Sequence, residues 1–282
     1  MTLVVAERRQ DQIRIWADSA LRKDLDTRKS YSAMGLKVFV LHRGLCVAFA
    51  GAAEDATTAI LGLNVDPQTG FDADDVVARL HSAHEENVGR SDFLIGSMTP
   101  TPILTRISGG EVLSVQHATH IGEPSAYSAY RQRYESIGRS DPMLDAMESV
   151  IDDEKISEVG GVPIGVDSAP FGFTYRTGWA TLAASHSTTI SPDAVPGKLY
   201  LMPIAKTAAE GGYRNVFAVP AEPGICAFAI YFQPGDFGYL LNPRADIYPI
   251  QITNVTQDEF AQQVEDRYEI ELIFHGQLHS DW

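Results

Sequence analysis

The chain has 282 residues, a length that fits one large domain or a main domain with a smaller one. Hydrophobic residues make up 44% and charged residues only 21%, a composition that excludes disorder as the main state. The formal net charge is −15, so nucleic-acid phosphates and anionic membrane surfaces would repel the chain as a whole. We therefore expect binding to neither nucleic acid nor membranes.

The sequence also bears on location. No stretch approaches the roughly 20 consecutive apolar residues that a membrane span needs. The first 20 residues carry charged side chains that argue against a secretory signal: Glu7, Arg8, Arg9, Asp11, Arg14 and Asp18. Cys46 and Cys226 both lie in apolar runs, where a free thiol acts as a small hydrophobe. These features predict a reducing, cytoplasmic setting.

The first 160 residues alternate between strand and helix patterns. Strands are predicted at 3–6, 13–17, 37–41, 45–50, 92–96, 103–107 and 112–115. Helices are predicted at 56–63, 72–87, 125–137 and 142–151. The polar segment 19–35 between the first two strand pairs is expected to be a surface loop.

Beyond the double glycine Gly160-Gly161 the strand pattern dominates. Strands are predicted at 162–166, 198–203, 215–219 and 225–232, and one helix at 256–268. Strands grouped apart from helices favour an α+β sandwich over a doubly wound parallel sheet. A change of texture near Trp179 predicts a domain at 1–178 and a β-rich C-terminal portion at 179–282.

The most informative feature for chemistry is the start, Met1-Thr2. Removal of Met1, which a small second residue commonly allows, would leave the Thr2 hydroxyl beside a free α-amine. An α-amine titrates at about 7.7–8.0, so near neutral pH it can accept the hydroxyl proton. Pairing a threonine hydroxyl with its own α-amine is a known way to activate this nucleophile.

The residues after Thr2 resemble the proteasome β-subunit family, whose members are N-terminal-nucleophile hydrolases. In that family an Asp-Ser pair ends the second strand 16 positions after the nucleophile, as Asp18-Ser19 follows Thr2. A lysine begins the third strand and a glycine ends the fourth 14 residues later, as Lys37 and Gly51 do. Fainter similarity at 93–97, 103–122 and 159–166 extends the resemblance over about residues 2–175.

The resemblance implies a fold and a role for each matched residue. It implies a four-layer αββα sandwich, to which this chain adds a β-rich C-terminal extension. Thr2 would be the nucleophile, Lys37 the cation that eases proton transfer, and Asp18 the carboxylate that orients Lys37. The Gly51 N–H would stabilise the oxyanion. No metal or cofactor is implied, and stacking through helical layers implies a homo-oligomer, as a ring or stacked rings.

Two departures concern the auxiliary proton network. Where active members of the family have Gly-Ser-Gly before the third helix, this chain has Gly122-Glu123-Pro124-Ser125. The helper serine is therefore absent or displaced to Ser125, with Glu123 or Glu158 as a substitute and Ser19 as a further auxiliary residue. The segment 155–159 also lacks the Asp and Ser that the family places ahead of its double glycine.

Simpler explanations stand beside these. Thr2 alone is most often an ordinary strand residue, Asp18 a turn residue and Lys37 a solvated strand start. His81 and His84 are three apart on one predicted helix, yet a solvated face explains them better than a zinc site, which needs further ligands. The aromatic run at 220–243 is either an apolar binding surface or, preferably, the core of a small β-rich domain.

The sequence thus predicts a cytoplasmic, bacterial threonine-type amide hydrolase or peptidase. Thr2 would cleave amide bonds in a peptide or small amide substrate after Met1 is removed. The alternative is a catalytically inactive assembly or binding module with the same fold, because the helper residues differ and a retained Met1 would leave only an amide nitrogen on Thr2.

Overall fold

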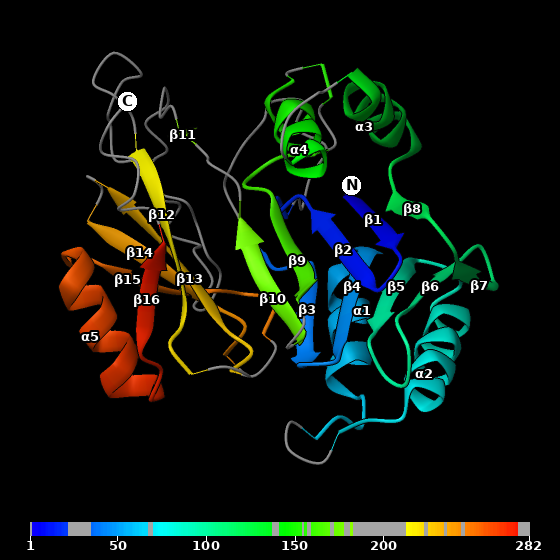
Figure 1. Ribbon diagram of the computed structural model, residues 1–282, viewed down its shortest axis with the longest axis horizontal. Helices are drawn as coiled ribbons and strands as arrows, with labels where there is room; N and C mark the ends of the chain where they lie inside the picture. Colours follow the sequence, from blue (N-terminus) through cyan, green and yellow to red (C-terminus); the bar gives the residue numbers. More distant parts are fainter. Residues whose placement is uncertain are drawn as a thin grey trace.

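The structure is a computed structural model with most of the chain described (Figure 1). The described residues are 2–21, 35–66, 70–136, 141–153, 155–156, 159–169, 172–177, 181–182, 213–222, 225–233, 236–243 and 246–275. Most of the predicted loop 19–35 and the predicted strand 198–203 lie outside them. None of the described helices is long and apolar enough to cross a membrane.

The first sheet is antiparallel and places the start of the chain near its middle. Its strand order is β10-β9-β2-β1-β8. Side chains alternate across it: Val4 and Ala6 of β1 point into the largest core cluster, and Leu3 and Val5 point to the opposite face. The strands are β1 (Leu3–Arg9), β2 (Gln12–Ala17), β8 (Ala118–Gly122), β9 (Ile164–Ala169) and β10 (Gly172–Thr177).

The second sheet is also antiparallel, in the order β3-β4-β5-β6-β7. Each of its strands pairs with its neighbour in the chain. Apolar residues of both sheets meet in one shared core cluster, which packs the two sheets face to face. The strands are β3 (Val38–His42), β4 (Leu45–Gly51), β5 (Ser91–Ser97), β6 (Ile103–Ser108) and β7 (Glu111–Val115).

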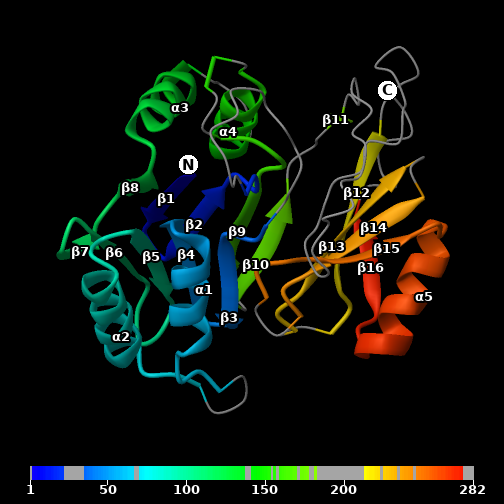
Figure 2. The same ribbon diagram turned by 180° about the vertical axis from the view of Figure 1, so that it is seen from behind.

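Two helices cover the outer face of each sheet, as Figures 1 and 2 show from opposite sides. Helices α1 (Ala53–Leu61) and α2 (Ala73–Glu86) pack on the second sheet, and α3 (Pro124–Ser136) and α4 (Pro142–Asp152) pack on the first. The Asp72 side chain begins α2 by accepting from the N–H groups of Asp74 and Asp75. Proline at the first position begins α3 and α4.

A third antiparallel sheet comes next in the chain, in the order β11-β12-β13-β14-β15, with β16 paired to β12. One face, with Phe228, Ile230 and Phe232, joins the core of the first two sheets. The other face packs under α5, which a capping box of Thr256 and Glu259 begins. The elements are β11 (Thr181–Leu182), β12 (Tyr213–Pro220), β13 (Phe228–Gln233), β14 (Phe237–Leu241), β15 (Ile250–Thr253), α5 (Gln257–Tyr268) and β16 (Leu272–His275).

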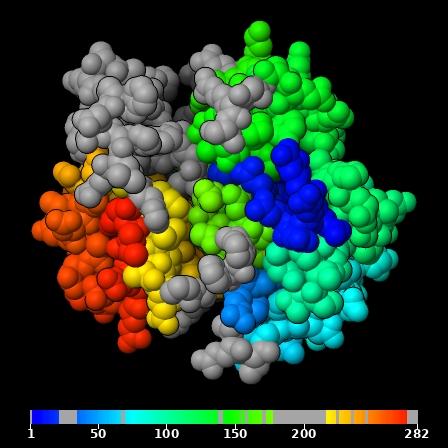
Figure 3. Space-filling view, viewed as in Figure 1, coloured from blue at the N-terminus to red at the C-terminus, as the bar shows by residue number. Residues whose placement is uncertain are grey.

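Polar groups fasten this third sheet to the first two. The buried Tyr175 hydroxyl on β10 donates to the Val38 carbonyl oxygen and accepts from the Val40 N–H. Asn242 at the end of β14 donates to the Val40 carbonyl oxygen and to the Tyr175 hydroxyl, both at 2.9 Å. The yellow atoms of β12 lie against the light-green atoms of β10 in Figure 3.

The prediction of a four-layer αββα sandwich with an appended extension is wrong, because a third sheet packs into the core of the two helix-covered sheets. The described residues form three antiparallel sheets with five helices, and the third sheet supplies part of the main core. The sequence did not show that the third sheet joins this core. Strand β13 is buried on both faces, one against the other sheets and one under α5. A sequence pattern shows that a strand is buried without showing which element buries it.

Individual helices and strands were predicted more accurately than the overall architecture. The two N-terminal hairpins, both early helix pairs and the helix near 256–268 are confirmed to within a few residues. In the aromatic run 220–243, Phe232 and Tyr239 are fully buried, and they lie in the core shared with the first two sheets. Burial raises the pKa of both thiols, that of Cys226 to about 11, so neither is a thiolate near neutral pH.

His84 differs from its prediction as a solvated residue, because it is only 2% exposed. Its Nδ1 lies 2.7 Å from the Ser91 carbonyl oxygen, and its Nε2 accepts from the Gly110 N–H at 2.9 Å. These contacts tie α2 to β5 and to the β6–β7 turn. No group of three metal-binding side chains was found among the described residues.

Candidate functional site

Four residues singled out in the sequence lie at the open ends of two hairpins. Thr2 precedes β1 and Asp18 follows β2, whereas Lys37 precedes β3 and Gly51 ends β4. The register of each hairpin sets its two ends side by side. Contacts between the sheets then bring the two open ends together.

The first of these contacts is a buried ion pair between Asp18 and Lys37. Lys37 Nζ donates to Asp18 Oδ2 at 2.9 Å, and the two side chains are 1% and 0% exposed. Asp18 also accepts from the N–H of Leu3 at 2.9 Å and of Gly160 at 3.2 Å. The carboxylate therefore links the Lys37 ammonium to the backbone of the residue after Thr2.

The energetics of this pair indicate more than a packing role. Removing two charges from water costs several kcal/mol for each ion, and well-packed apolar residues are often as stable in the same place. Asp18 and Lys37 nevertheless form their ion pair in the interior, with both side chains buried. Buried charge of this kind is a marker of functional sites, although structural ion pairs share it.

The second contact runs through the end of β8 and brings the start of β1 close to the end of β4. The Thr2 carbonyl oxygen accepts from the Glu123 N–H at 2.9 Å. Gly122 has φ +95°, and a Cβ there would collide with that carbonyl oxygen and lie 3.3 Å from the Ala50 side chain. Only glycine tolerates both conditions, so Gly122 lets Thr2 lie close to the residue before Gly51.

Gly51 has a backbone conformation that requires glycine, with φ +109° and no room for a Cβ beside the Arg90 carbonyl oxygen. Two residues earlier, the Phe49 N–H donates to the Lys37 carbonyl oxygen at 3.0 Å. Alternate N–H groups of a strand point to the same side. The Gly51 N–H is therefore directed toward the start of β3, past the last paired residue of that strand.

Ser19 is buried and holds the double-glycine segment against the end of β2. Its hydroxyl oxygen accepts from the Val162 N–H at 2.8 Å, and its own N–H donates to the Gly160 carbonyl oxygen. A Cβ on Gly161 would collide with the Ser19 hydroxyl, so the two segments are in close contact. Backbone contacts thus occupy the Ser19 hydroxyl oxygen.

Glu123 and Ser125 meet at the beginning of α3. The Ser125 N–H and hydroxyl both donate to Glu123 Oε1, at 3.3 and 2.8 Å. This pairing satisfies a free N–H at the helix terminus. The backbone of Glu123 contacts Thr2, and its carboxylate caps the helix.

A stacked histidine lies two residues before Gly122. The His120 ring lies 3.6 Å from the Tyr127 ring, with the planes 10° apart. Burial, with a smaller effect of the Arg106 charge, lowers the pKa of His120 to about 4. His120 is therefore neutral near pH 7 and adds no positive charge beside the site.

Sequence reasoning missed Leu3, Gly122 and Gly160 as contributors. Each acts through its backbone, for which side-chain chemistry gives no signal. The double glycine and the faint family similarity at 103–122 were the available hints, but strand β8 at 118–122 was not predicted. Residues 157 and 158, part of the departure at 155–159, lie outside the described residues.

Comparison with known proteins gives only a loose likeness. The chain is similar to the Anbu (Gly-1) mutant from Hyphomicrobium sp. strain MC1, with 18% identity and a TM-score of 0.47 over 63% of this chain and 86% of that chain. Anbu from the same strain matches with 17% identity and a TM-score of 0.47, over 62% of this chain and 87% of that chain. Likenesses this weak carry no argument about the site.

No protein-family profile and no curated protein matches this chain. The assignment to the proteasome β-subunit family, which the sequence resemblance implied, is wrong, because the solved structures that the chain resembles are Anbu, at 17–18% identity. The two structural likenesses also leave more than a third of the chain uncovered. The site has to be judged on its own geometry.

Proposed function

We propose that the chain is an amide hydrolase in which Thr2, with its α-amine freed by removal of Met1, is the nucleophile. The observation that carries this proposal is the buried Asp18–Lys37 pair, fixed to the backbone directly after Thr2. Burying this ion pair against the first residue of β1 costs desolvation free energy and adds little stability. A role in a reaction therefore explains the pair better than a role in folding.

Each step has a named group. The Thr2 hydroxyl oxygen attacks the amide carbon while the α-amine takes the hydroxyl proton. The Gly51 N–H stabilises the oxyanion that forms on the carbonyl oxygen. The C–N bond then breaks, the α-amine returns the proton to the leaving amine, and water hydrolyses the Thr2 ester.

Lys37 and Asp18 act on the α-amine rather than on the substrate. A cation close to an amine favours its neutral form, which is the form that accepts a proton. Asp18 keeps the Lys37 ammonium in place and anchors the Leu3 N–H, so the nucleophile and the cation have a common reference point. Glu123 and Ser125 fix the backbone of Thr2 from the other side.

A β-lactone tests the proposal, because it acylates an activated hydroxyl and adds its full mass. We expect intact mass and peptide mapping to find the adduct on Thr2 of the wild-type chain. Thr2→Ser should keep the adduct and Thr2→Ala should lose it, with both variants folded as judged by circular dichroism. A chain with a free Thr2 amine that gains no adduct, or gains it elsewhere, contradicts the proposal and leaves the inactive binding module.

A further inference from the structure

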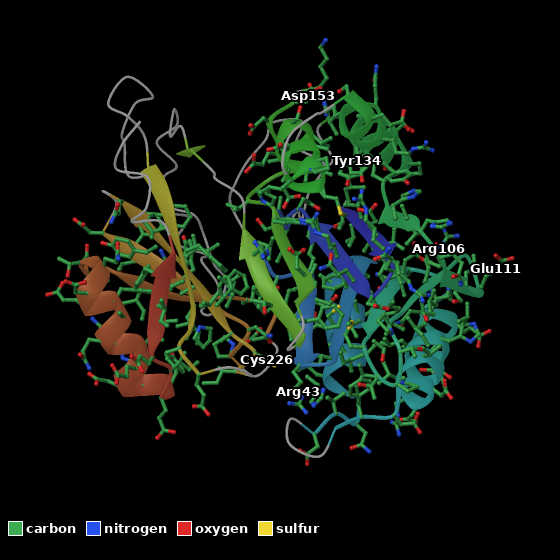
Figure 4. All side chains as sticks on the ribbon, in the orientation of Figure 1. Arg43, Arg106, Glu111, Tyr134, Asp153 and Cys226 are labelled. Atoms are coloured by element: carbon green, nitrogen blue, oxygen red, sulfur yellow. The ribbon has the colours of Figure 1, made fainter. Side chains whose placement is uncertain are left out.

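Strand β7 forms a free sheet edge on the side of the molecule away from the third sheet (Figure 1). Among the described strands it pairs only with β6. Val112 and Leu113 are 42% and 41% exposed, and Glu111 points away from the protein in Figure 4. The opposite edge of this sheet, at β3, is bonded by Asn242 of the third sheet.

The β7 edge lacks most of the features that normally keep a free strand from pairing with another chain. Native edges are blocked by charged side chains, above all lysine, by proline, by a bulge, by a very short strand or by a covering element. Of these, the five-residue strand β7 has one charged side chain, that of Glu111. The sequence Glu-Val-Leu-Ser-Val contains neither lysine nor proline, and its register with β6 is unbroken. Val112 and Leu113 add an exposed apolar side chain to each face of this edge.

We propose that this edge is covered by β7 of a second copy of the chain, antiparallel, with Leu113 on the two-fold axis. The β6–β7 hairpin closes at Ser108 and Glu111 on a two-residue glycine turn. Its alternation therefore directs the N–H and C=O groups of Val112 and Ser114 away from β6. In this register Val112 of each copy faces Ser114 of the other, so the outward N–H and C=O groups of both copies are hydrogen-bonded.

Charge and shape at the ends of β7 favour the same register. An open groove of about 930 Å³ lies beside the end of β7, lined by Arg8, Arg9, Gln10, Asp11, Gln12, Gln116 and His117. The two-fold axis brings the β6–β7 turn of one copy over the groove of the other. Glu111 then faces Arg8 and His117, and neither Glu111 nor Arg8 has an ion-pair partner among the described residues.

The β6–β7 turn can enter such a groove because it is unobstructed. A Cβ built on Gly109 or Gly110 would meet no atom within 4 Å. The net charge of −15 on each copy opposes association at long range, but physiological salt screens charges beyond about 8 Å. The short-range attraction of Glu111 to Arg8 and His117 across the interface then outweighs the long-range repulsion between the copies.

Oligomeric state tests this proposal. Light scattering with size exclusion should give wild-type chain twice the mass of the 30.8 kDa monomer. Leu113→Lys, which sets two ammonium groups on the axis, and Ser114→Pro, which removes an outward N–H, should each raise the dimer dissociation constant at least tenfold. Ile273→Lys, at an equally exposed position on β16, should leave it unchanged, and thermal melts should show all variants folded.

A charge reversal separates pairing from general damage. Glu111→Arg and Arg8→Glu should each weaken the dimer, and the double variant should restore it. In a Cys226→Ser background, Leu113→Cys should form a disulfide-linked dimer on oxidation. A wild-type chain that stays monomeric at about 100 µM, or an oligomer that all β7 variants leave intact, overturns the proposal.

Discussion

At the scale of single residues, a family resemblance in the sequence singled out four residues but did not show how they meet. Thr2, Asp18, Lys37 and Gly51 were selected because their spacing matches that of the family, and their catalytic roles stay predictions. Their contacts depend on the Asp18 carboxylate bridging two sheets and on the close approach at Gly122. Such long-range contacts leave no periodic pattern in the sequence, so the geometry that joins these residues could not be predicted from it.

Breaking the buried ion pair should separate stability from activity. Lys37→Met leaves the Asp18 charge unpaired, which we expect to cost about 3–5 kcal/mol in the free energy of unfolding. Adding Asp18→Asn should recover part of that loss without restoring acylation of Thr2. Urea unfolding and β-lactone labelling measure the two effects, and full labelling of the folded double variant would show that the pair is purely structural.

His120 should make stability depend on pH. Its pKa is about 4 in the folded chain against 6.5 for a free histidine, so the unfolded chain binds more protons between these values. Stability should therefore fall as the pH drops from about 6.5 to about 4. His120→Phe keeps a ring on Tyr127 and should reduce the loss by about 1–2 kcal/mol, allowing for solvent screening at this half-buried site.

Urea unfolding of wild type and His120→Phe at pH 7 and pH 5 checks this expectation. The carboxylates titrate in both chains, so the difference between the two isolates the histidine. If the free energy of unfolding changes equally with pH in the two chains, His120 is not the cause of the pH dependence.

At the scale of elements, hairpins and amphipathic helices were predictable because their patterns are local. Strand β8 was missed because residues 118–122 are short and only partly buried, and β14 because burial on both faces removes alternation. The joint between the third sheet and the others rests on Tyr175, Asn242 and Val40. Polar groups that pair over such long sequence separations give no local signal.

Two tyrosines offer a matched test of this joint. Tyr175→Phe removes a hydroxyl that bonds Val38, Val40 and Asn242, so it should cost about 1–3 kcal/mol by leaving buried groups unpaired. The Tyr239 hydroxyl is equally buried but has no partner among the described residues. Tyr239→Phe should therefore be neutral or slightly stabilising, and equal losses in urea unfolding would argue against the joint.

At the scale of the whole molecule, the proposed boundary at 178–179 separates residues that share one core. Phe228, Ile230 and Tyr239 pack with residues of the first two sheets, and Leu36 donates its N–H to the Ile247 carbonyl oxygen. The sequence pattern changes near this boundary, but it does not show that residues after 178 fill the core of the residues before them. The predicted boundary remains untested as a domain limit.

Truncation after residue 178 tests how far the two parts depend on each other. We expect the shortened chain to lose cooperative unfolding and to bind a hydrophobic dye, since it exposes the apolar surface that β13 and β14 cover. Thermal melts followed by near-ultraviolet circular dichroism show the outcome. A truncated chain that melts cooperatively near the wild-type temperature would establish an independent domain.

The central claim is that Thr2 is an N-terminal nucleophile, and one measurement tests it most directly. Intact mass and N-terminal sequencing of the protein purified from its own cells should find a chain that begins at Thr2 with a free amine. A mature protein that keeps Met1 would have an amide nitrogen on Thr2, which accepts no proton from the hydroxyl. That result would contradict the hydrolase and leave Asp18 and Lys37 as a structural clamp.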